Sequence, residues 1–182
     1  MKNIIKILFV IYIFSFPLKS FALIEVDITR GNLNPLPVAV SALSSSEKDK
    51  KSLENKLDVK NLGLEISKIV ENNLRQSGLF NPLNKDAFLQ KPDIAHLKPR
   101  FEDWALIKAQ ALITGKVNLQ DDKLRVEFRL WDVLAGKEML ALAFTTVPKN
   151  WRRVGHIITD KVYERLTGEK GYFDTRIIYV SE

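Results

Sequence analysis

The two histidines, His96 and His156, are the first residues to test for chemistry. An imidazole pair can begin a metal site, but the chain has no cysteine, and neither histidine has a partner at a metal-ligand spacing. We therefore predict no bound metal. We interpret both rings as exposed or hydrogen-bonded.

A carboxylate pair and a glycine followed by a lysine are the next candidates. Asp121 and Asp122 could act as acid and base, but aspartate is typical of turns and no pocket is indicated around this pair. Gly115 and Lys116 lack the preceding spaced glycine of a phosphate-binding loop. The sequence therefore predicts no catalytic residue and no cofactor, and we expect a protein that is not an enzyme.

Trp151, Arg152 and Arg153 combine an aromatic ring with two cations, as a nucleic-acid-binding patch does. An apolar stripe at helical spacing includes Trp151 and leaves both arginines on its flank. We therefore favour a packed tryptophan beside solvated charges. A nucleic-acid-binding module remains the alternative, because the sequence pI of about 9.4 is basic.

Residues 1–22 have the pattern of a secretory signal peptide. Lys2 and Lys6 precede an apolar run over 7–16, and Ser20 and Ala22 are the small residues that a signal peptidase reads. The alternative is an uncleaved anchor, but ten apolar residues span roughly 15 Å of a ~30 Å hydrocarbon core. We expect a mature chain that begins near Leu23 and lies in the periplasm.

Cleavage would change the composition of the chain. The segment 1–22 contains three lysines and no acidic residue, so the formal net charge of +6 falls by half. About 160 residues would remain, which is the size of one domain. No later apolar run approaches the length of a membrane span, so we expect no transmembrane segment after cleavage.

An extended arm is predicted over 23–34. Polar and apolar side chains alternate from Glu25 to Thr29, which is typical of a strand. Gly31, Pro35 and Pro37 follow, and proline interrupts the hydrogen bonding of a sheet. These residues separate the arm from the globular part of the chain.

The periodicity of apolar residues predicts helices and strands in the remainder. We expect helices over 57–77, 101–108 and 149–167, strands over 38–40, 112–117, 124–131 and 139–147, and a short extended piece over 79–83. Gly78 and Gly168 are expected to end helices and Asn150 to cap one. We expect solvated loops over 44–51 and 91–99, and a three-stranded antiparallel meander with one buried face and one wet face.

The last residues form a β-prone run with nothing after it to pair with. Arg176-Ile177-Ile178-Tyr179-Val180 is rich in β-branched side chains. We interpret this run as the first strand of a further domain.

Several sequence blocks together resemble the amino-terminal domain of the TolB family of the Tol-Pal envelope system. The blocks are 25–31 with 37–40, 73–83, 131–133, 151–156 and 166–180. Their order and spacing match throughout the mature chain. The resemblance implies an α/β fold, a mixed five-stranded sheet packed with helices like the anticodon-binding domains of tRNA synthetases, followed by a six-bladed β-propeller.

The resemblance also implies how the chain is divided. The predicted parts are a signal peptide (1–22), an arm (23–34), the α/β domain (35–170) and one strand of an absent propeller (171–182). A fragment, a truncated gene product or a pseudogene remnant would have this form.

Partners are implied by the resemblance as well. In the family the segment after the signal docks on TolA, and the outer-membrane lipoprotein Pal binds the propeller. The matching residues here are Glu25, Val26, Asp27, Ile28, Thr29, Arg30, Gly31 and Asn32. A short alternating strand can add to an exposed sheet edge. The alternative is that 25–29 form an edge strand of the domain's own sheet.

The resemblance implies a monomeric, non-enzymatic adaptor that supports outer-membrane integrity and envelope constriction in cell division. Export argues against the nucleic-acid alternative. A secreted hydrolase would require a nucleophile–base pair or a metal group, which the sequence does not show.

Overall fold

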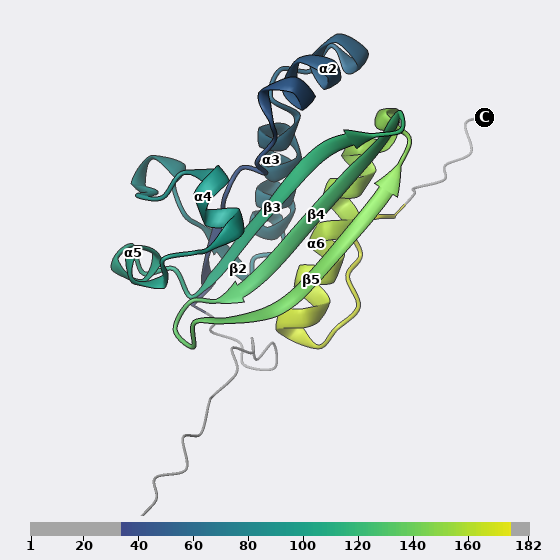
Figure 1. Ribbon diagram of the computed structural model, residues 1–182. Coiled ribbons are helices and arrows are strands. Elements are labelled where there is room, and N and C mark those ends of the chain that lie inside the picture. Colours follow the sequence, from purple (N-terminus) through teal and green to yellow (C-terminus); the bar gives the residue numbers. More distant parts are fainter. Residues whose placement is uncertain (1–33, 176–182) are drawn as a thin grey trace, which may run out of the picture.

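The computed structural model describes residues 34–175 (Figure 1). Three predictions therefore lie outside the described residues: the signal peptide over 1–22, the docking segment Glu25–Asn32 and the terminal run Arg176–Val180.

The described residues form one sheet with the strand order β2-β1-β3-β4-β5. The strands are β1 (Leu36–Val40), β2 (Phe80–Pro82), β3 (Ala111–Gln120), β4 (Lys123–Asp132) and β5 (Lys137–Thr146). β1 pairs in parallel with both β2 and β3, whereas β3, β4 and β5 form an antiparallel meander. The predicted mixed five-stranded sheet is confirmed.

The β3–β4 hairpin shows how the sequence forms these strands. Along β4, buried residues alternate with partly exposed ones, as expected for a strand with one face on a core. Asp121 and Asp122 form the tip and both have positive φ, 48° and 60°. Two such residues suit the tight turn that a two-residue hairpin requires. The interpretation of this aspartate pair as turn residues agrees with the structure.

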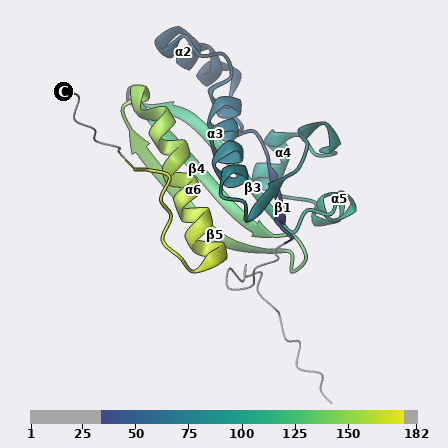
Figure 2. The ribbon, with the colours of Figure 1, turned by 180° about the vertical axis from the view of Figure 1, so that it is seen from behind.

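Two long helices, α3 (Leu62–Gln76) and α6 (Trp151–Thr167), cover one face of the sheet, as Figure 2 shows. They pack against each other and against the apolar side of the meander. Ile66, Leu74, Ile158 and Leu166 are among the side chains in this main core, each at most 1% exposed. At 3.6 residues per turn their spacing places them on one face of each helix.

A small lobe covers part of the opposite face. Its helices are α4 (Pro92–Leu97) and α5 (Phe101–Leu106), and Trp104 packs there against Ala39 and Leu112. The prediction of one wet sheet face is therefore wrong for β3, whose residues from Ala111 to Gly115 are all buried. A helical lobe on the second face explains why this part of β3 is buried on both sides.

Two further predictions are wrong in the region before α3. The stretch predicted as a solvated loop contributes to a helix, α2 (Glu47–Leu57), and the next helix begins at Leu62 rather than near Leu57. The Ser46 side chain caps α2 by accepting a hydrogen bond from the Asp49 N–H. Leu53 is the one buried residue of α2. A helix with so little apolar surface leaves no periodic signal in the sequence.

The other helix boundaries are partly as expected. Gly78 and Gly168 have φ of 74° and 75° at helix ends, which confirms both predicted stops. Asn150 makes no capping bond; its amide donates to the Thr146 Oγ1 at 3.3 Å. A 3₁₀ turn, η2 (Pro148–Asn150), runs directly into α6 and takes the place of the cap. The predicted loop over 91–99 contains α4.

Candidate functional site

The predicted docking residues 25–32 precede a strand in the interior of the sheet. The described chain starts at Asn34 and Pro35, which are exposed, and enters β1, which has neighbours on both sides. The sheet edges lie at β2 and β5. If residues 25–29 form an edge strand of this sheet, they must therefore cross to one of these two strands.

β5 is the longer of the two edges. Within the described residues it pairs with β4 alone, and from Met139 to Thr146 it carries no charged side chain. Unpaired backbone groups of such an edge accept an added strand. A groove of about 300 Å³ runs between β5 and α6; its lining residues are Ala143, Phe144, Thr145, Thr146, Asn150, Arg153, Val154 and Ile157.

His156 is a structural residue at the contact between α3 and α6. Its Nδ1 lies 2.9 Å from the Asn73 Nδ2, which also donates to the Thr159 Oγ1 at 3.1 Å. The interpretation of this ring as hydrogen-bonded agrees with the structure.

His96 differs from the prediction. It is 7% exposed, and its Nδ1 has no hydrogen-bond partner, so the ring is neither exposed nor fully hydrogen-bonded. α4 packs on β3, and this packing explains the burial. Burial lowers the pKa of His96, and the nearby cation Arg129 lowers it further.

The remaining sequence candidates have structural roles. Lys56 binds the Asp122 carboxylate at 2.6 Å and lowers the pKa of that group. Trp151 is 5% exposed, and the Arg152 guanidinium lies 4.2 Å from its ring centre. The packed tryptophan beside solvated charge is therefore observed. Among residues 34–175, no group of three or more His, Asp or Glu side chains could hold a metal ion.

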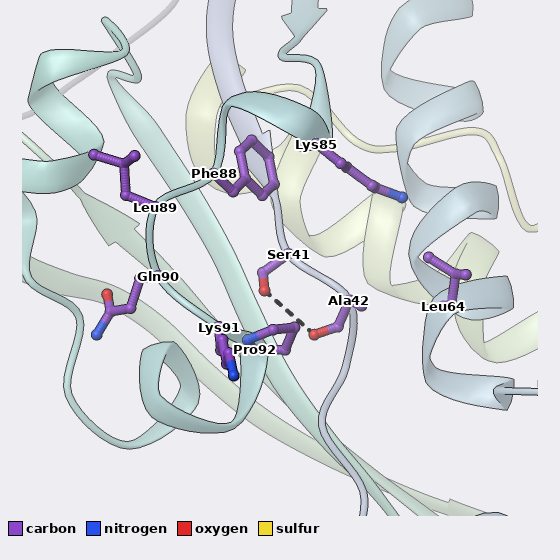
Figure 3. A pocket seen from close by; sticks show the side chains of 9 residues that line it. All are labelled: Ser41, Ala42, Leu64, Lys85, Phe88, Leu89, Gln90, Lys91 and Pro92. Carbon is purple, nitrogen blue, oxygen red and sulfur yellow. Dashed lines mark hydrogen bonds between the residues drawn. The ribbon is translucent and has the colours of Figure 1, made fainter.

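A pocket that the sequence did not reveal lies directly after β1 (Figure 3). Its volume is about 440 Å³, and its lining residues are Ser41, Ala42, Leu64, Lys85, Phe88, Leu89, Gln90, Lys91 and Pro92. These residues come from three separated segments. The sequence gives the order of these segments but not their proximity. The lysines near Pro92 were the one weak indication of a binding site.

Gln90 holds the loop that forms one wall of this pocket. Its Nε2 donates to the Lys98 carbonyl at 3.0 Å, and its Oε1 accepts from the Arg100 N–H at 3.0 Å and from the Trp104 Nε1 at 3.1 Å. The side chain is 3% exposed and uses its polar atoms inside the lobe. The wall is thus fixed by a satisfied buried amide.

Within residues 34–175, no helix has the length and apolar character needed to cross a membrane.

Known proteins match this chain in sequence and in fold. A family model described as the TolB amino-terminal domain matches residues 24–139. The Tol-Pal system protein TolB of Pelagibacter ubique (strain HTCC1062) is 76% identical over 179 residues, which cover 98% of this chain and 40% of that relative. The crystal structure of TolB from Acinetobacter baumannii superposes with a TM-score of 0.60 at 19% identity, over 82% of this chain and 32% of that one. This last likeness concerns the fold alone.

Proposed function

The chain belongs to the family of TolB amino-terminal domains, and from this membership we propose that it acts as a periplasmic, non-enzymatic adaptor of the Tol-Pal system. The observation that carries the proposal is the 76% identity to a protein named for that system. The chain spans 40% of that relative's length. The signal-peptide pattern over 1–22 supports export to the periplasm.

At the full length of its relatives, the proposed adaptor links inner-membrane Tol proteins to the outer-membrane lipoprotein Pal, and so supports outer-membrane integrity and envelope constriction at division. Residues Glu25–Asn32 dock on TolA by adding a strand to a sheet of TolA. The alternation of Glu25, Val26, Asp27 and Ile28 supports this mode, because backbone hydrogen bonds give affinity and alternate side chains give specificity.

The proposal is tested with an Ile28→Pro variant. Proline removes a backbone donor and fixes φ, so strand pairing should fail and binding to the carboxy-terminal domain of TolA should largely vanish in calorimetric titration. Ile28→Val is the matched control, because valine keeps the donor and the β-branched shape. A proline variant with full affinity would refute strand addition.

Melting temperature separates docking from folding. Position 28 is separated from β1 in the sequence by Gly31 and Pro35, whereas Pro37, which was expected to separate the arm as well, lies within β1. A surface change outside the packed core costs within about 0.5 kcal/mol, so Ile28→Pro should leave the melting temperature almost unchanged. A loss of affinity together with a fall of several degrees would identify 25–29 as an edge strand of this domain instead.

Pal is proposed to bind the part of full-length relatives that this chain does not span. Titration of purified Pal into residues 23–182 should give no heat of binding, and submicromolar affinity would contradict this division. The nucleic-acid alternative rests on the basic composition and on the implied likeness to anticodon-binding domains. Trp151 does not support it, because this ring is buried beneath Arg152 and offers no free stacking face.

A further inference from the structure

The pocket of Figure 3 lies where the chain connections diverge around β1. The route from β1 to β2 runs through α3, on the face of the main core. The route from β2 to β3 returns past β1 through the α4–α5 lobe, on the opposite face. Figures 1 and 2 show α3 and α4 on either side of the sheet. In open α/β sheets, the crevice at the carboxyl end of such a strand is the usual ligand site.

The dimensions of the pocket suit a small molecule. Its volume of about 440 Å³ falls within the ~300–1,000 Å³ typical of ligand sites. Leu64 of α3, Phe88, Leu89 and Pro92 line the pocket, and Figure 3 shows Leu64 across from Phe88 and Leu89. These four side chains are apolar, so the body of the ligand should be apolar as well.

Two polar groups in the pocket are available to a ligand. Ser41 is 1% exposed, and its hydroxyl donates to the adjacent Ala42 carbonyl at 3.3 Å, longer than an ordinary O–H···O bond. Figure 3 shows this hydroxyl turned toward Ala42 and Pro92. Within the described part of the chain, no residue forms an ion pair or a side-chain hydrogen bond with Lys91.

The other polar side chains in the lining are already engaged. Lys85 binds the Glu71 carboxylate at 2.9 Å and donates to the Ser67 hydroxyl at 3.3 Å. Gln90 turns its amide into the lobe. The pocket therefore combines a buried hydroxyl, an ammonium that has no ion-pair partner among residues 34–175, and apolar side chains.

We propose that this pocket binds a monocarboxylate with an apolar body. The carboxylate accepts hydrogen bonds from the Lys91 ammonium and from the Ser41 hydroxyl, whose single proton then turns from the Ala42 carbonyl to the ligand. The apolar body lies between Leu64 and the wall of Phe88 and Leu89. A free aliphatic acid and the carboxyl terminus of a peptide that ends in an apolar residue share this chemistry.

Decanoate is the first probe, added to the full chain and followed by the indole N–H signals of its three tryptophans in NMR spectra. Trp104 contacts two lining residues: its ring centre lies 5.0 Å from that of Phe88, and its Nε1 binds Gln90. We expect a saturable shift of the Trp104 signal and none of Trp151, which packs in the main core. Absence of a saturable shift up to about 5 mM decanoate overturns the proposal.

Head-group chemistry is tested with decanol and decylamine at the same concentrations. Both should bind more weakly than decanoate, and equal binding of either one overturns the carboxylate assignment. A hexapeptide ending in leucine, with a free or an amidated terminus, distinguishes the two sources. If the free-acid peptide binds tighter than decanoate and the amide does not, the ligand is a peptide terminus; weaker binding assigns a free acid.

Variants locate the site. Ser41→Ala should weaken decanoate binding about tenfold, because a buried donor to a charged acceptor is lost. Lys91→Gln should weaken it by up to about fivefold, whereas Lys98→Gln, which changes a lysine of the same lobe outside the lining, should leave it unchanged.

Leu89→Gln and Leu97→Gln form a second pair of variants. Both leucines are exposed, at 60% and 76%, but only Leu89 lines the pocket, so only Leu89→Gln should weaken decanoate binding. Equal effects within either pair overturn the placement.

Discussion

The Asp160 carboxylate, in the middle of α6, accepts a hydrogen bond from the backbone N–H of Phe173 at 2.7 Å. Its second oxygen accepts from the N–H of Asp174 at 3.1 Å. Arg153, two turns earlier on α6, binds the Asp174 carboxylate at 3.0 Å. One face of a single helix thus fixes the segment that follows it.

Gly171 permits this arrangement. A Cβ at position 171 would overlap the Asp160 backbone and side chain, so only glycine lets the chain approach α6 so closely. The rings of Tyr172 and Phe173 then pack on Tyr163, with centres 5.5 Å and 5.8 Å away. The path of residues 171–174 is therefore determined by their contacts with α6.

Asp160→Asn should loosen this segment. The amide keeps one acceptor oxygen but loses the charge and the second acceptor, and a hydrogen bond to a charged group contributes about 1.5 kcal/mol or more. Hydrogen exchange at the amides of Phe173 and Asp174 should accelerate about tenfold. Glu169→Gln, in an exposed carboxylate nearby, is the control and should leave both amides unchanged.

Gly63→Ala should destabilise the fold strongly. A Cβ there would overlap the Leu43 carbonyl, a backbone group that cannot turn aside as a flexible side chain could. We expect a loss of about 3 kcal/mol in the free energy of unfolding, measured by urea denaturation. Lys68→Ala, on the exposed side of the same helix, should cost within about 0.5 kcal/mol. A Gly63→Ala variant as stable as Lys68→Ala would show that this contact is not tight in solution.

His96→Phe should remove part of the acid sensitivity of the fold. The pKa of His96 is lowered in the folded protein by burial, so the unfolded chain takes up this proton first. The neutral ring therefore contributes fully to the free energy of unfolding above the ordinary pKa near 6.5. This contribution is lost as the pH falls below 6.5, and it stops changing once the pH is below the pKa of His96 in the folded protein. The difference in melting temperature, His96→Phe minus the original chain, should therefore increase as the pH is lowered from 7.5 to 5.5. A difference independent of pH would contradict this assignment.

The fourth prediction is that the signal peptide over 1–22 is cleaved. Amino-terminal sequencing of periplasmic material should give a chain that starts near Leu23, after Ser20 and Ala22. A retained Met1 in a membrane pellet would show that residues 1–22 act as an anchor.

The sequence determined the elements whose signals are local and periodic. The stripe of Ile158, Val162 and Leu166 is enough to predict α6, because a helix that buries one face must repeat its apolar residues every three or four positions. Alternation along 124–130 and the aspartate pair at 121–122 are likewise enough for the β3–β4 hairpin. The matching blocks were enough for the family, which the comparison over residues 24–139 confirms.

Only the tertiary structure decided the features that join distant segments. α2 was not predicted, because Leu53 is its sole buried side chain and a single buried residue gives no periodic pattern of apolar residues. The pocket after β1 joins Ser41, Leu64 and Phe88, whose proximity depends on how the sheet orders its strands. Burial of His96 likewise follows from the packing of α4 on β3. Local sequence patterns indicate which face of a helix or strand is buried. Which side chains contact that face depends on the crossovers between strands, and a crossover joins segments too far apart for a local pattern to show.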